Sequence, residues 1–218
     1  MATRHYLSNP VSSYLSSPFR GNWTSYWDSY MQVQGTTAFG STLTGNTYQD
    51  EQDSVNPKSV FGLLAFTPPF TASGQVQGSL SGCVYATQRT EVTSNPCYLR
   101  LCLWLADGSR NFKSMIVAPQ VLGAQLPATS DGFPLTGVGF SGVALTNAVA
   151  NAGDLIVAEF GYSFSNSSNV GTVWRRGGAA QALSSGGQNG QPWMEFSGID
   201  SLYSAAPAIE SGRFFLSP

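Results

Sequence analysis

The sequence NAGDLIVAEFGYSFSNSSN, residues 151–169, gives the clearest indication of how this chain folds. It begins with a turn signal, because Gly153 tolerates a positive φ and the Asp154 carboxylate can accept a hydrogen bond from a backbone amide. Residues 155–162 are then almost all apolar, and Glu159 carries the only charge. A short apolar run between turn residues is typical of a strand buried on both faces. We therefore expect a central strand of a β-sandwich here.

Two further strands are expected after this run. The Ser and Asn residues at 165–169 favour a turn, because their side chains compete for backbone hydrogen bonds. Residues 171–175 (GTVWR) then follow at hairpin distance. Beyond a loop rich in Gly, Ser and Gln at 176–191, residues 192–197 (PWMEFS) predict a short third strand that closes the sheet.

These segments also carry a resemblance to a known family. GDLIVAEFGY at 153–162, the Ser/Asn turn and PWMEFS at 192–197 resemble the C-terminal part of a family of bacteriophage and prophage proteins. MATRHYL at 1–7 and SGQVQG at 73–78 resemble two earlier segments of the same family. The likeness covers most of residues 1–197 in order. It implies a virion-associated β-sandwich and brings no catalytic residues with it.

The middle of the chain supplies the most regular strand. In residues 97–105, the residues Cys97, Leu99, Leu101, Leu103 and Leu105 share one face, with Tyr98, Arg100, Cys102 and Trp104 on the other. Asp107-Gly108 is a turn signal, and residues 112–117 return antiparallel to complete a hairpin. Further strands are expected at residues 60–66 and 74–89, whereas residues 143–150 fit either a helical turn or a strand.

Eight to ten expected strands, regular turns and no long amphipathic helix predict an all-β fold, an antiparallel β-sandwich of jelly-roll type. We expect the sandwich to occupy residues 36–203. Extended arms flank it: an aromatic N-terminal arm at 1–35 and an apolar C-terminal arm at 204–218.

The composition limits the classes of function. Charged residues make up only 10% of the chain, against the roughly 25% of an average protein, and Ser, Thr, Asn, Gln and Gly take their place. Ten scattered Lys and Arg residues give no electrostatic footprint for nucleic acid. We expect no secretory signal and no membrane span, because no apolar window approaches the required length.

The three cysteines, Cys83, Cys97 and Cys102, are expected to be small buried residues with reduced thiols. A Cys97–Cys102 disulfide is disfavoured, since the two side chains point to opposite faces of one strand. Pairing of Cys83 with either partner stays open, and three cysteines without a nearby histidine do not predict a zinc site.

The two arms supply the candidate interface residues. Trp23, Tyr26, Trp27 and Tyr30 lie within nine residues, and Phe214, Phe215 and Leu216 come just before the C-terminus. Such aromatic residues dominate protein interfaces. The alternatives for the first group are a helical turn that caps the sandwich, from the spacing of Trp23, Trp27 and Met31, or a stacking platform for a sugar.

Catalytic candidates are few. The one histidine, His5, is interpreted as a residue of a strand or a subunit contact, so a catalytic triad or a histidine-bound metal is not expected. A sandwich glycoside hydrolase needs only two carboxylates, and Glu159 and Glu195 on their two strands would be that pair. The acidic residues at 49–53 lack the spacing of a calcium loop and are expected in a solvated loop.

These observations favour a binding protein and not an enzyme, without cofactor or metal. The favoured function is a structural component of a tailed-phage virion, assembled in the bacterial cytoplasm: a capsid decoration or cement protein, or a neck or tail protein. Its expected partners are copies of itself and other virion proteins, with no nucleic acid and no membrane. The alternatives are a carbohydrate-binding module directed at a surface glycan and, third, the sandwich hydrolase.

Overall fold

The computed structural model describes residues 2–10, 36–40, 47–53, 58–88, 96–128, 136–164, 170–177 and 192–203. Within these ranges the chain consists of strands, turns and one short 3-10 helix, η2 (Asp200–Leu202). The strands are β1 (Ala2–Pro10), β2 (Thr36–Gly40), β3 (Thr47–Asp53), β4 (Lys58–Phe66), β5 (Gly74–Val76), β6 (Ser79–Gln88), β7 (Tyr98–Ala106), β8 (Phe112–Gln125), β9 (Thr136–Ala144), β10 (Ala148–Ala150), β11 (Leu155–Phe164), β12 (Val170–Gly177) and β13 (Trp193–Ser197).

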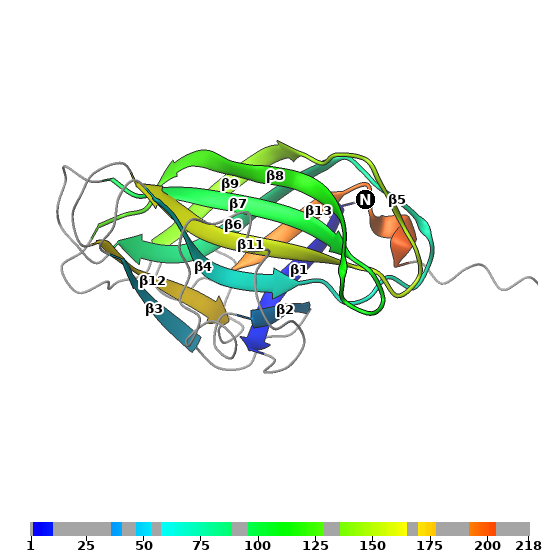
Figure 1. The fold of residues 1–218 in the computed structure, drawn as a ribbon, viewed down its shortest axis with the longest axis horizontal. Helices are drawn as coiled ribbons and strands as arrows, with labels where there is room; N and C mark the ends of the chain where they lie inside the picture. Colours follow the sequence, from blue (N-terminus) through cyan, green and yellow to red (C-terminus); the bar gives the residue numbers. More distant parts are fainter. Residues whose placement is uncertain are drawn as a thin grey trace, which may run out of the picture.

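The strands form one large sheet that folds over into two layers (Figure 1). Its order is β3-β12-β6-β13-β1-β2-β4-β11-β7-β8, with β9 paired to the other side of β6. We call β9, β6, β13 and β1 the β6 layer, and β4, β11, β7 and β8 the β11 layer. Strand β2 joins the layers, antiparallel to β1 and parallel to β4. Strands β5 and β10 pair separately. The all-β sandwich is confirmed, whereas its jelly-roll connectivity stays a prediction.

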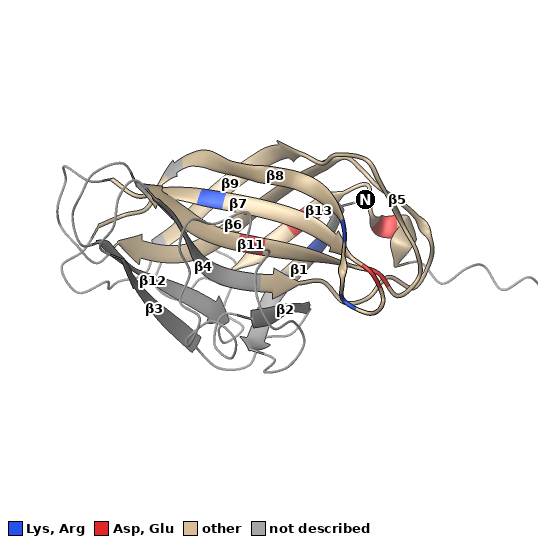
Figure 2. Ribbon diagram, viewed as in Figure 1, with Lys and Arg blue, Asp and Glu red and all other residues tan. Residues whose placement is uncertain are grey.

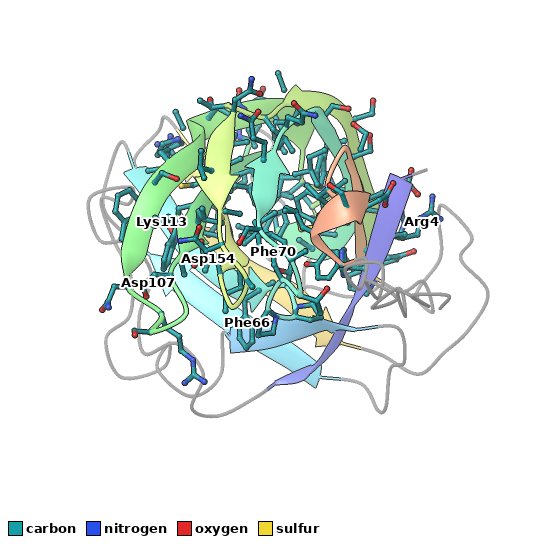
Figure 3. The ribbon with its side chains drawn as sticks, turned by 90° about the vertical axis from the view of Figure 1, so that its right-hand side faces the viewer. Arg4, Phe66, Phe70, Asp107, Lys113 and Asp154 are labelled. Atoms are coloured by element: carbon teal, nitrogen blue, oxygen red, sulfur yellow. The ribbon has the colours of Figure 1, made fainter. Side chains whose placement is uncertain are left out.

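Strand β11 has the central position that its apolar run predicts. It pairs with β4 on one edge and with β7 on the other, and every residue from 155 to 162 is buried. The turn before it also has the expected chemistry: Gly153 has a φ of 92°, and Asp154 Oδ2 accepts a hydrogen bond from the Asn151 amide at 2.8 Å. Lys113 of β8 binds the same oxygen at 2.6 Å and ties this turn to the neighbouring hairpin (Figure 3).

The β7–β8 hairpin is also confirmed. Leu99, Leu101, Leu103 and Leu105 are fully buried in the core between the layers, as their alternation predicts. Asp107 closes the turn by accepting hydrogen bonds from the amides of Ser109 and Asn111. Strand β8 continues past Pro119, which is tolerated because β8 is the last strand of the sheet order and has a free edge among the described strands.

One apolar core lies between the layers. Leu80, Val84, Met194 and Phe196 of the β6 layer belong to the same buried cluster as the leucines of β7. Phe140 of β9 meets Phe160 of β11 with ring centroids 6.1 Å apart. Burial of each such side chain contributes roughly 1.5–3 kcal/mol, so the contact between layers is the main source of stability. Charged residues are sparse over the described ribbon (Figure 2).

The predicted partner of β12 is wrong. Residues 171–175 do form a strand, but β12 pairs with β3 and β6 and not with β11. The reason is that both edges of β11 are already occupied, by β4 and β7, so the chain has to cross to the other layer. Strand β13 is likewise an inner strand between β6 and β1, and it does not close the sheet.

Three further expectations need correction. Residues 2–10 of the expected N-terminal arm form β1, which is paired on both sides within the sheet. The acidic segment at 49–53 belongs to strand β3 and is not a loop. The expected strand at 74–89 is divided into β5 and β6 at Gly78, whose φ is 93°. Residues 143–150, left open by the sequence, contain the end of β9 and all of β10.

Candidate functional site

The interface residues expected in the two arms lie outside the described residues: Trp23, Tyr26, Trp27, Tyr30, Phe214, Phe215 and Leu216. The described part of the chain does fix the point at which the C-terminal segment begins. Leu202 is fully buried, and the Tyr203 ring packs against Phe70 and His5 at centroid distances of 5.3 Å each. Tyr203, the last described residue, is therefore anchored beside β1.

The two candidate hydrolase carboxylates lie on opposite outer faces of the sandwich. In β11 the neighbours of Glu159, Ala158 and Phe160, point into the core, and in β13 the neighbours of Glu195, Met194 and Phe196, do the same. Facing layers lie about 10 Å apart, and both carboxylates point away from the space between them. Their separation therefore exceeds the roughly 9.5 Å limit of a hydrolase pair, and the pairing of Glu159 with Glu195 is wrong.

Each of these glutamates has a structural contact instead. Glu159 is fully buried, and its Oε1 accepts a hydrogen bond from the indole N–H of Trp104 at 2.7 Å. Glu195 Oε2 lies 2.7 Å from Nε of Arg4, the residue opposite it on β1. Arg4 is on the flank of the sandwich opposite Lys113 and Asp107 (Figure 3).

His5 lies within strand β1, as expected, and it points into the core. Its side chain is 7% exposed and packs edge-on against Phe196 at 5.8 Å. Burial lowers the pKa of His5 from 6.5 to about 4, so the imidazole is neutral near pH 7. A neutral ring between aromatic neighbours is a packing residue.

The cysteine interpretation is confirmed: Cys83, Cys97 and Cys102 are all free and buried. Burial raises the pKa of Cys83 to about 11 and that of Cys97 to about 12, so their thiols stay protonated. The pKa of Cys102 is also raised, first by burial and then by the Glu159 carboxylate. The Cys102 sulfur contacts Met115 on the outer face, whereas Cys97 lies in the core.

A groove with mixed chemistry lies on the outer face of the β6 layer. It has a volume of about 510 Å³ and is lined by Ser81, Gly82 and Cys83 of β6, by Gly137, Gly139, Phe140 and Ser141 of β9, and by Trp193 of β13. Its volume lies within the roughly 300–1,000 Å³ range of small-ligand sites.

The groove follows from the alternation of β9. In the segment GVGFSG, residues 137–142, Val138 and Phe140 pack on the core side. Gly137 and Gly139 occupy the outer side, opposite Tyr85 and Cys83 of β6. Because these two positions carry no side chain, the outer surface is hollow beside the large Trp193 ring.

Trp193 is held in place by its neighbours. It packs against Cys83 and Tyr85, and the guanidinium carbon of Arg4 lies 4.2 Å from the centroid of its ring. This cation–π contact and the ion pair of Arg4 with Glu195 favour the observed orientation of the indole. None of the described residues accepts a hydrogen bond from the Trp193 N–H. The groove thus offers a fixed aromatic ring with an available donor.

Within the same described ranges, no group of three or more His, Cys, Asp or Glu residues is arranged to hold a metal ion. A search for helices that could cross a membrane found none among these residues.

Comparison with known proteins identifies the fold only. No family model matches the chain, and no curated protein matches it. A crystal structure of a CocE/NonD family hydrolase from Staphylococcus aureus is similar with a TM-score of 0.50 and 8% identity over 90% of this chain. The crystal structure of an aminopeptidase from a Thaumarchaeota archaeon has a TM-score of 0.46 and 10% sequence identity over 77% of this chain. This chain spans 36% of the length of each of these proteins.

Trp193, Arg4 and the two β9 glycines were not predicted from the sequence as site residues. The alternation of small and large residues at 137–142 was present in the sequence and could have indicated a hollow strand face. Nothing local indicated that β9 and β13 would both pair with β6 and so bring Trp193 beside those glycines.

Proposed function

We propose that this chain is a structural component of a tailed-phage particle that acts by binding neighbouring subunits. The observation that carries the proposal is the anchored exit at Tyr203. Its ring packs on His5 and Phe70, so a rigid sandwich ends where the apolar C-terminal segment begins. The low charge of the chain is compatible with close packing, because few charges have to be desolvated at a contact.

The resemblance to phage proteins over most of residues 1–197 supports the same proposal. In it, residues 204–218, with Phe214, Phe215 and Leu216, bury apolar surface on a neighbouring subunit at roughly 25 cal/mol per Å². Trp23, Tyr26, Trp27 and Tyr30 supply a second contact. The partners are other copies of the chain and other virion proteins.

We further propose that the chain is not an enzyme. The similar CocE/NonD family hydrolase is a protein of which this chain spans 36%, and at 8% identity the likeness supports the fold alone. The carboxylates that suggested glycoside hydrolysis lie on strands of different layers, and each has a structural contact, Glu159 with Trp104 and Glu195 with Arg4.

The test compares particle incorporation of two variants with that of the unaltered chain. One variant lacks residues 204–218, and the other keeps its full length but carries Phe214→Ser, Phe215→Ser and Leu216→Ser. Both should fold, shown by an unchanged thermal transition, and both should be lost from purified particles in an immunoblot. Incorporation at the unaltered level would overturn the proposal for the C-terminal segment. Absence of the unaltered chain from particles would overturn the virion function itself.

A carbohydrate-binding module is the second candidate, and one specific observation favours it: the groove beside Trp193. This site differs from the aromatic residues at 23–30 that suggested sugar binding in the sequence.

A further inference from the structure

We propose that the groove on the outer face of the β6 layer is a binding site for a neutral saccharide of about one or two pyranose rings. The inference goes beyond the virion function and does not depend on it. It rests on the shape of the groove, on the fixed position of Trp193 and on the balance of charge at the rim.

The shape is set by backbone that is free of side chains. A Cβ added at Gly139 would have no atom closer than the Gly82 carbonyl oxygen at 3.9 Å, so the space above this residue is open. At Gly137, by contrast, a Cβ would lie 3.0 Å from the Cys83 sulfur and 3.2 Å from the Tyr85 ring. Close packing against Cys83 and Tyr85 therefore explains why residue 137 is a glycine. The space above Gly139, in contrast, is filled by no described residue.

The lining combines a flat apolar surface with hydrogen-bonding groups. Trp193 supplies the ring, fixed from one side by Arg4, and its indole N–H is an available donor. Ser141 adds an exposed hydroxyl, and the Ser81 hydroxyl, which accepts a bond from the Gly142 amide at 3.4 Å, still has its own hydrogen to donate. A ligand with an apolar ring face and hydroxyls at its edge matches this combination.

The charges favour a neutral ligand. Among the described residues, Arg4 contacts the Trp193 ring and forms an ion pair with Glu195 at 2.7 Å. A charged ligand would have to separate this pair or compete with one of its members. A neutral, hydroxylated ring leaves this ion pair intact.

The experiment titrates the full-length chain with a panel of neutral hexoses, N-acetylhexosamines and their disaccharides, by calorimetry and by tryptophan fluorescence. We expect saturable binding of at least one member. Gly139→Val places a side chain in the groove, at a position where an added Cβ has no atom closer than 3.9 Å, and should weaken that binding at least tenfold. Trp193→Ala should do the same. Gly108→Ala is the control, a methyl added in the β7–β8 turn with its nearest atom at 3.6 Å, and it should bind like the unaltered chain.

The variants separate a binding defect from a folding defect. Because Trp193 also packs on Cys83 and Tyr85, the binding of Trp193→Ala is interpreted together with its thermal transition. At Gly139 an added Cβ has no atom closer than 3.9 Å, so Gly139→Val tests the groove with less disturbance of the packing. No binding by any member of the panel would overturn the proposal. Binding that survives both groove variants would overturn it as well, by placing the saccharide elsewhere. Neither result bears on whether the chain is incorporated into particles.

Discussion

His5 illustrates how a single residue acquires its role from the strand opposite it. On β1 it pairs with Met194 of β13, whose side chain is in the core, so the imidazole also points inward. Its neighbours there are the rings of Phe196 and Tyr203. Burial among them disfavours the charged form and lowers the pKa to about 4. The charge of this residue is therefore coupled to folding.

We predict that the free energy of unfolding falls in mild acid because His5 is buried in its neutral form. The pKa of His5 is 6.5 in the unfolded chain and about 4 in the folded chain. At pH values between these two, the unfolded chain binds one proton more than the folded chain. The stabilisation by neutral His5 is fully present above about pH 6.5 and is lost as the pH falls. The loss is complete below about pH 4, where it amounts to roughly 3 kcal/mol. Urea unfolding at several pH values measures it. His5→Leu is the control, because it keeps every carboxylate, and an identical pH slope in both proteins would contradict the prediction.

At the scale of the element, Gly78 determines where one expected strand becomes two. Its φ of 93° turns the chain between β5 and β6, and its carbonyl accepts a hydrogen bond from the Leu145 amide at 2.9 Å. The next residue, Ser79, donates its amide to the Ser197 hydroxyl at 2.8 Å. The turn therefore packs directly on the end of β13.

We predict that Gly78→Ala costs more than about 3 kcal/mol of unfolding free energy. Its Cβ would lie 2.2 Å from the Ser197 carbonyl oxygen, a backbone atom that cannot rotate away. Gly142→Ala is the matched control: its φ is also positive, at 68°, but no atom lies within 4 Å, so only the backbone penalty of about 1–2 kcal/mol remains. Denaturant unfolding measures both, and equal losses would show that the contact with Ser197 does not matter.

At the scale of the whole molecule, the large core cluster of the described residues is shared between the two layers. Leu80 of β6 and Leu101 of β7 come from different layers, yet both are fully buried in the same cluster. Strand β2 also links the layers through its backbone, pairing with β1 and β4. Among the described residues, the large cluster takes side chains from both layers, so we expect the layers to unfold together.

We predict that Leu80→Ala and Leu101→Ala each lower the unfolding free energy by roughly 2–5 kcal/mol. Each should shift one common transition, with the same midpoint by fluorescence and by circular dichroism. Val149→Ala, at a side chain that is 64% exposed, should cost less than about 0.5 kcal/mol. Two separate transitions in either leucine variant would contradict a shared core.

Local patterns were sufficient for β11 and for the β7–β8 hairpin. The apolar run at 155–162, the alternation at 97–105 and the Asp107 turn are each complete within a few neighbouring residues. The period of the pattern and the chemistry of the turn act at short range, so the strands and their buried faces could be predicted from the sequence. The free, buried cysteines could be predicted in the same way.

The tertiary structure alone decided the pairing and, with it, the candidate site. Strand β12 lies beside β6 because both edges of β11 are occupied, and Glu159 and Glu195 are kept apart because their strands belong to different layers. The groove arises only where β9 and β13 pair with the same strand. A strand's own residues specify which of its faces is buried, but its partners depend on which edges the rest of the chain leaves free.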